Sequence, residues 1–83
     1  MVSSIKYSEW EMVRVLKPCS LGRVWHGRLP QVGDCGVIVH INEDKNATEP
    51  WTIYIVENTE FKDSGDADLI WLAEFSAGEI ERY

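Results

Sequence analysis

The sequence predicts a small all-β domain with five short strands, on the basis of three observations. The chain has 83 residues, which is the length of a single domain. Its apolar residues fall into short runs separated by glycine, proline and acidic residues, a pattern typical of β-proteins. Its 4 Trp, 3 Tyr and 2 Phe are large enough to fill the thin core that a chain of this length can form.

The first strand is expected at residues 10–16 (WEMVRVL), where Val13 and Val15 fall on one face. Lys17-Pro18 ends this run because proline cannot donate a hydrogen bond to a β-ladder. Residues 17–33 (KPCSLGRVWHGRLPQVG) show no alternation, and we expect them to form one long loop. Loops of this length often carry function.

The second strand is expected at residues 37–42 (VIVHIN), which alternate between two faces and follow a glycine-rich turn. Gly33-Asp34 suits a turn with positive φ, and Gly36 suits a bulge or a sharp bend. Residues 43–50 (EDKNATEP) read as a polar hairpin loop.

The third strand, residues 51–56 (WTIYIV), is apolar on both faces and is expected to be central. An acidic loop follows at residues 57–68, then a fourth strand at residues 69–75 (LIWLAEF). Ser76 and Glu79 have the spacing of a capping box, which predicts one helical turn before a last short strand at residues 80–83. This is the layout of a five-stranded SH3-like barrel in one domain, with residues 1–9 as a flexible N-terminal arm.

Several stretches carry a family resemblance. Residues 30–41, with Gly33-Asp34 and Gly36 ahead of VIVHI, resemble the turn and strand of KOW-like and related SH3-like barrels. The chain also looks like a group of small bacterial SH3-like domains without a defined activity. The motifs behind that likeness are VRVLKP, the Gly33-Asp34 and Gly36 turn with VIVHI, YIVEN, IWLAEF and EIE. The resemblance covers about residues 10–83. The resemblance implies the fold and assigns no activity. RNA-binding KOW loops are usually basic, whereas this chain is acidic.

Charge and composition exclude several classes of protein. The formal net charge is −6, and the second half of the chain is far more acidic than the first. Acidity argues against a general nucleic-acid binder, which needs clustered Lys and Arg. The sequence is too apolar for disorder and has no run long enough for a membrane helix. The N-terminus shows no secretory signal, so we expect a cytoplasmic protein with both cysteines reduced.

No catalytic residue, metal site or cofactor is predicted. Cys19 and His26 could form a nucleophile–base pair, but a packed thiol and a solvated imidazole explain them better. Cys19, His26, Cys35 and His40 are a possible zinc set without the usual close pairing. The acids at 57, 60, 63, 66 and 68 could bind calcium, but they lack EF-hand spacing, and a solvated acidic loop is the better interpretation.

The expected function is protein binding, with no enzymatic activity. The candidate contact residues are Arg23, Trp25, His26 and Arg28 in the long loop, together with Trp71, because Trp and Arg dominate interface hot spots. The partner is another protein or a second copy of the chain. One alternative is an acidic inhibitor, of the immunity or antitoxin kind, that meets a basic enzyme. A second alternative is weak binding of single-stranded nucleic acid through the loop.

Overall fold

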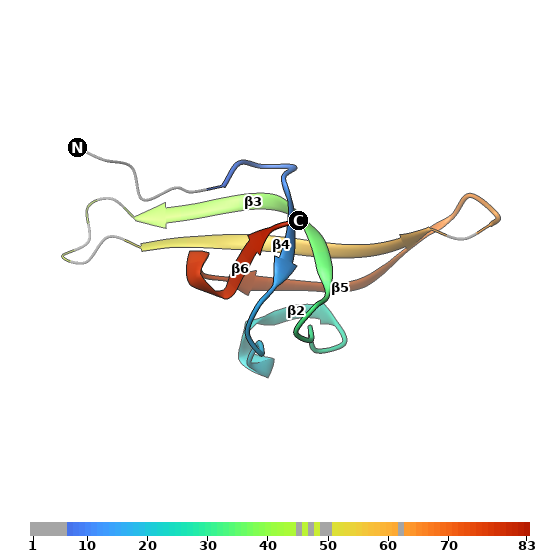
Figure 1. The fold of residues 1–83 in the computed structure, drawn as a ribbon, viewed down its shortest axis with the longest axis horizontal. Coiled ribbons are helices and arrows are strands. Elements are labelled where there is room, and N and C mark those ends of the chain that lie inside the picture. The colour runs from blue at the N-terminus through green and yellow to red at the C-terminus, as the bar shows by residue number, and fades with distance from the viewer. Residues whose placement is uncertain (1–6, 45, 47, 49–50, 62) are drawn as a thin grey trace.

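The computed structural model describes residues 7–44, 46, 48, 51–61 and 63–83. Within this part of the chain, six strands form one antiparallel sheet (Figure 1). The strands and 3₁₀ turns are β1 (Met12–Val15), η1 (Leu21–Arg23), β2 (Val24–Gly27), β3 (Cys35–Asp44), β4 (Trp51–Phe61), β5 (Ala67–Phe75), η2 (Ala77–Glu79) and β6 (Ile80–Arg82). The all-β prediction is confirmed, and the predicted strand count of five is wrong.

The sheet order is β2-β5-β4-β3-β1-β6, and β4 is paired along both of its edges. This confirms the central place predicted for residues 51–56. The two outermost strands, β2 and β6, have four and three residues, and no pairing joins them within the described part of the chain. The sheet is therefore not closed, and the predicted closure into a barrel is wrong. Side chains link the two 3₁₀ turns that precede these outer strands, because Arg23 in η1 forms an ion pair with Glu79 in η2.

The strand that the sequence did not predict is β2, which lies inside the stretch that was expected to be one long loop. Val24, His26 and Gly27 pair with Ala73, Leu72 and Trp71 of β5, with an irregularity between Val24 and His26. A four-residue segment with a bulge is too short to show alternation in sequence, so only its pairing with β5 reveals it as a strand. The predicted helical turn is confirmed as η2, where the Glu79 carboxylate accepts hydrogen bonds from the Ser76 N–H (2.9 Å) and the Ser76 hydroxyl (2.8 Å).

One face of the curled sheet carries the core. Most buried side chains come from β1, β3, β4, β5 and β6, and Cys19 and Pro30 join them from the segment between β1 and β3. Trp71 packs edge-on against Phe75 with ring centroids 5.8 Å apart. Tyr7 covers one end of this core, since its ring stacks edge-on to Tyr54 at 5.3 Å and its hydroxyl donates to the Ile80 carbonyl. Tyr7 belongs to the segment that was expected to be a flexible arm (residues 1–9), of which residues 1–6 lie outside the described part. Buried core residues are Val13, Val15, Cys19, Ile38, Tyr54, Val56, Trp71, Ala73, Phe75 and Ile80.

The longest strands extend beyond this core, which gives the molecule extents of 47 × 23 × 18 Å. At one end β3 and β4 approach the 45–50 loop, of which residues 45, 47, 49 and 50 lie outside the described part. At the other end β4 and β5 continue as a two-stranded projection, at the right of Figure 1. We call this projection the β4–β5 arm (described residues 58–61 and 63–69). Its strands occupy most of the segment that was expected to be an acidic loop.

Candidate functional site

The four candidate loop residues lie close together in the chain, but acidic side chains already neutralise the two arginines among them. Trp25 and His26 are exposed on the edge strand β2, and 56% of Trp25 is accessible to solvent. Arg23 forms its ion pair with Glu79, and Arg28 Nη1 lies 2.7 Å from Asp34 Oδ2. Both arginines therefore hold the loop onto the domain. The loop presents an exposed indole without a matching positive patch.

Trp71 is not part of this surface, which corrects its assignment as a contact residue. It is completely buried on the core face of β5, on the same side as Ala73 and Phe75, whereas its neighbours Ile70 and Leu72 are only partly buried. The sequence left open which face of this strand is buried, because both faces carry large apolar residues. Trp71 is a core residue and cannot contact a partner in this structure.

Asp34 organises the turn that follows the loop. Its carboxylate accepts hydrogen bonds from the Gln31 N–H (2.9 Å) and from Arg28 (2.7 Å), and Gly33 beside it has a φ of +94°, as predicted for this turn. Partial burial raises the pKa of the Asp34 carboxyl, but Arg28, the Gln31 N–H and the nearby Trp71 indole together hold it below its ordinary value. The carboxylate therefore stays ionised and acts as a structural acceptor.

The cysteines and histidines do not assemble into a reactive or metal-binding site. Cys19 is buried, and burial, followed by the effect of Glu79, raises the pKa of its thiol. A raised thiol pKa is the opposite of what a nucleophilic cysteine needs. His40 is exposed on β3, where its Nε2 lies 2.8 Å from Asn42 Oδ1. Across the described residues, no group of three or more His, Cys, Asp or Glu side chains could hold a metal ion.

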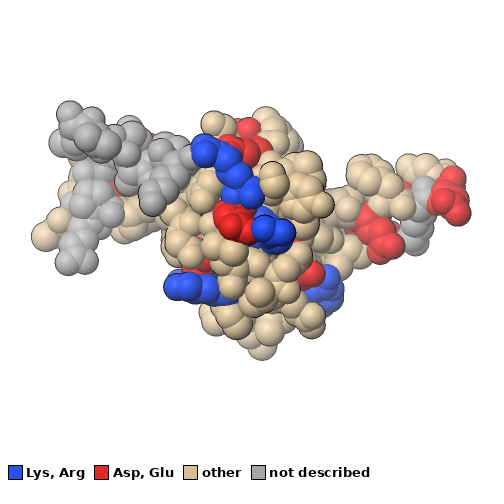
Figure 2. All heavy atoms as spheres, viewed as in Figure 1, with Lys and Arg blue, Asp and Glu red and all other residues tan. Residues whose placement is uncertain are grey.

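The acidic residues that were expected in a solvated loop lie on the β4–β5 arm instead. Glu60 and Asp68 face each other across the two strands, and Asp63 and Asp66 flank the turn. Figure 2 shows acidic side chains along the projection, whereas acidic and basic side chains alternate on the body. The arm therefore concentrates negative charge at one end of the molecule.

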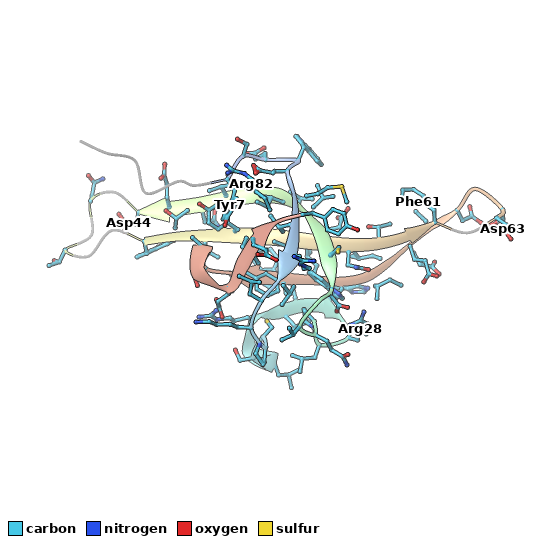
Figure 3. All side chains as sticks on the ribbon, in the orientation of Figure 1. Tyr7, Arg28, Asp44, Phe61, Asp63 and Arg82 are labelled. Atoms are coloured by element: carbon cyan, nitrogen blue, oxygen red, sulfur yellow. The ribbon has the colours of Figure 1, made fainter. Side chains whose placement is uncertain are left out.

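An open groove of about 700 Å³ lies at the base of this arm. Three exposed apolar side chains border it: Trp10 (71% accessible), Met12 (50%) and Phe61 (79%). Figure 3 shows Phe61 on the arm, away from the body, with Asp63 beyond it. We call this site the arm groove; its lining residues are Trp10, Met12, Cys35, Gly36, Val37, Glu57, Asn58, Thr59, Phe61 and Ala67.

The backbone holds Trp10 at the rim of the groove in a rare conformation. Trp10 has a φ of +69°, and it is the one non-glycine residue with positive φ in the described part of the chain. This conformation is costly for a side chain with a Cβ, by about 1–2 kcal/mol. Two backbone hydrogen bonds maintain it, from the Trp10 N–H to the Ile38 carbonyl (2.6 Å) and from the Glu11 N–H to the Ser8 carbonyl (3.2 Å). Strain of this kind that exposes a large indole is a feature often found at functional sites.

Sequence reasoning missed the arm groove because its parts are distant in the chain. Residues 10–12, 35–37 and 57–67 meet only through the pairing of β1 with β3 and of β3 with β4. One signal was present: Phe61 is an isolated aromatic residue inside an acidic segment, where no core function was expected.

Comparison with family models, curated proteins and solved structures finds no match for this chain. In the part of the chain that the structure describes, no helix is long and apolar enough to cross a membrane.

Proposed function

We propose that this chain is a non-enzymatic protein-binding module of the SH3-like kind, and that it docks a basic partner on the arm groove. The observation that carries the proposal is the combination of three exposed apolar side chains at the groove with the acidic arm beside them. Apolar anchors supply affinity once they are covered, and surrounding charges select and steer the partner. This moves the expected contact surface from the loop at residues 23–28 to the arm.

The pattern of ion pairs supports an acidic rather than a basic recognition surface. All four arginines of the described part form ion pairs with acids: Arg14 with Glu81, Arg23 with Glu79, Arg28 with Asp34, and Arg82 with Glu11. A phosphate backbone would have to compete with these carboxylates for the loop arginines. Binding of nucleic acid through the loop is therefore the weaker candidate.

The arm carries negative charge. Glu57, at the base of the arm, lines the groove, and Glu60, Asp63 and Asp66 follow along the arm. A basic surface that approaches this end meets a negative potential, which raises the rate of association at low salt. An inhibitor that occupies the basic cleft of an enzyme would use the same chemistry. The proposal therefore includes the acidic-inhibitor alternative as one kind of partner.

Binding of a defined probe tests this function. The probe is a fluorescein-labelled octapeptide of alternating lysine and valine, and the control peptide has glutamate in place of lysine. We expect the lysine peptide to bind, with an affinity that falls as salt is raised. Neutralising the arm (E60Q, D63N, D66N) should weaken binding about tenfold, if each of these three arm charges contributes roughly 0.5 kcal/mol. The matched control E74Q removes one charge from β5 outside the groove and should leave binding unchanged.

The opposite results would overturn the proposal. Equal binding of the lysine and glutamate peptides, or of the neutralised and wild-type arms, would show that the acidic arm does not select the partner. Absence of any binding of the lysine peptide at low salt would remove the groove as a docking site.

Self-association through β2 is a second candidate, because Trp25 is exposed on this edge strand and Leu21 and Val32 are exposed in the segments before and after it. Leu21, Trp25 and Val32 are 76%, 56% and 59% accessible. Light scattering over a concentration series at low and high salt tests it. A dimer that survives high salt and is lost in W25A supports this candidate, and a monomer at all concentrations excludes it.

A further inference from the structure

We infer that the arm groove receives its partner as an added β-strand, which pairs with residues 58–61 of β4. This inference rests on the proposed function and specifies how the partner binds. It predicts an extended partner segment in which apolar and basic residues alternate. Three features of the structure carry it: an unpaired strand edge, a groove beside that edge, and different chemistry on the two faces of the arm.

The first feature is the unequal length of the pairing on the two sides of β4. On one side β5 pairs with β4 as far as Phe61, which lies opposite Ala67. On the other side β3 pairs with β4 only as far as Glu57, which lies opposite Val37. In the described part of the chain, residues 58–61 therefore have a strand neighbour on one edge only. In an extended strand, alternate residues direct their N–H and C=O groups to each edge, so the other edge is a template for a further strand.

The start of β3 explains why this edge stays open. Val37, Gly36 and Cys35 turn toward β1, where they pair with Met12, Val13 and Arg14. A side chain supplies the next contact, because Asn58 Nδ2 donates to the Cys35 carbonyl. Beyond Asn58 no such substitute occurs among the described residues, and β4 continues into the arm without a neighbour on this side.

The second feature is the position of the groove. Its lining includes Asn58, Thr59 and Phe61, which belong to the open edge segment itself. Across the groove lie Met12 of β1 and Trp10, both exposed. A strand added along β4 would therefore occupy the groove and cover these apolar side chains. Cover for Met12 and Phe61 would supply affinity that backbone pairing alone lacks.

The third feature is the chemical difference between the two faces of the arm. Glu57, Thr59 and Phe61 alternate onto the groove face, whereas Glu60 and Asp68 lie opposite each other on the other face. Side chains of an added strand alternate in the same way. Its groove-facing residues would meet Met12 and Phe61, and the residues between them would lie beside Glu60. Opposite charges on neighbouring strands attract, so Lys or Arg suits these intervening positions.

Charge also argues against a second copy of this chain as the added strand. Each copy carries a formal net charge of −6, and the arm is one of its acidic regions. Two acidic arms placed edge to edge would repel each other. A segment of a basic protein has the complementary charge.

Backbone methylation of the probe peptide separates strand addition from simple docking of side chains. Two versions of the lysine–valine octapeptide are made, one N-methylated at every valine and one at every lysine. These modifications block the N–H groups of opposite edges of the extended peptide. Strand addition predicts that one version binds at least tenfold more weakly and the other binds within about threefold of the parent. Similar affinity of both versions and the parent would overturn the inference.

Variants of the arm test the location. Phe61 and Leu69 both lie on the arm, but only Phe61 is among the groove-lining residues. Phe61 is 79% exposed, so F61A should fold normally and bind the unmodified peptide about fivefold more weakly. The matched control L69A should bind like the wild type. A larger effect of L69A would place the peptide on the β5 edge and overturn the inference.

Hydrogen exchange by NMR gives an independent readout. Peptide binding should slow exchange of amides within residues 58–61, and protection confined to residues 67–69 would contradict the assignment. The two proposals fail in different ways. If the unmodified lysine peptide does not bind, the proposed function fails; if it binds and methylation has no effect, only strand addition fails.

Discussion

Gly36 lies close to β4, and its replacement by valine should destabilise the domain strongly. A Cβ atom built on Gly36 would lie 2.6 Å from Val56 Cγ1, 2.7 Å from the Glu57 carbonyl oxygen and 3.2 Å from the Trp71 ring. Carbon atoms in contact are normally about 3.5–4.0 Å apart, so the first two distances require about 1 Å of movement. Val56 and Trp71 are fully buried, and the Glu57 carbonyl belongs to the backbone of the central strand. The Val56 and Trp71 side chains and the Glu57 backbone therefore cannot move aside without disturbing the core.

The magnitude follows from the cost of overpacking a filled core, which is about 1–3 kcal/mol for added methyl groups. G36A should lie in this range, and G36V, with two further methyl groups, should exceed it. For a domain of this size each kcal/mol lowers Tm by about 4–8 °C, so G36A should lose at least about 4 °C. Thermal unfolding followed by circular dichroism measures these shifts. The matched control is G22A, because a Cβ on Gly22 would meet nothing within 4 Å.

The control should leave Tm unchanged or raise it slightly, since alanine restricts the unfolded chain more than glycine does. A Tm for G36V within about 2 °C of the wild type would refute the reasoning, because that shift is smaller than the effect of 1 kcal/mol. In that case β3 would have room to move away from β4, and the close approach at Gly36 would not be a requirement of the fold.

Two further predictions concern the edge strands. G27A should destabilise more than G36A, because Gly27 has a φ of +82° and its added Cβ would lie 1.9 Å from the Ile70 carbonyl oxygen. The Arg28 N–H donates to that oxygen, so G27A should show a lower Tm and faster hydrogen exchange at the Arg28 amide. The second concerns acid. Burial raises the pKa of Glu79, but bonds from Ser76 and Arg23 outweigh it and hold the pKa below its ordinary value of 4.5. A lowered folded-state pKa means that this stabilisation is present above about pH 4.5 and is lost as pH falls through the folded-state value. E79Q should therefore lower Tm at pH 7 and flatten the fall in Tm below pH 4.5; parallel profiles for the two proteins would contradict it.

The local patterns predicted most of the strands, and the differences have physical causes. Alternation in VIVHIN and the apolar run WTIYIV marked the centres of β3 and β4, but both strands are longer than those runs. Residues 57–61 carry Glu, Asn and Thr, of which the first two are depleted in strands. They are extended because β5 pairs with them from Glu57↔Leu72 to Phe61↔Ala67. Pairing between distant segments decided their structure against local propensity.

The candidate site shows the same division. Trp25 and the arginines of the loop stood out in sequence because Trp and Arg are common at interfaces. Arg23 forms its ion pair with Glu79, which lies 56 positions further along the chain, and Arg28 forms its ion pair with Asp34. No count of nearby charges could reveal that partner. The sequence likewise could not predict the arm groove, because residues from distant segments, such as Trp10 and Phe61, line it together.

The sequence by itself determined the fold class, the capped turn before the last strand and the turn at Gly33-Asp34, because each depends on side-chain alternation or on backbone preferences within a few residues. The tertiary structure alone decided which face of β5 holds the core, where β2 pairs, and that the acidic segment forms a projecting hairpin beside an apolar groove. These features depend on strand register and on contacts between segments far apart in the chain. A two-residue repeat specifies that a strand has two faces, and only packing against the other strands specifies which of them is buried.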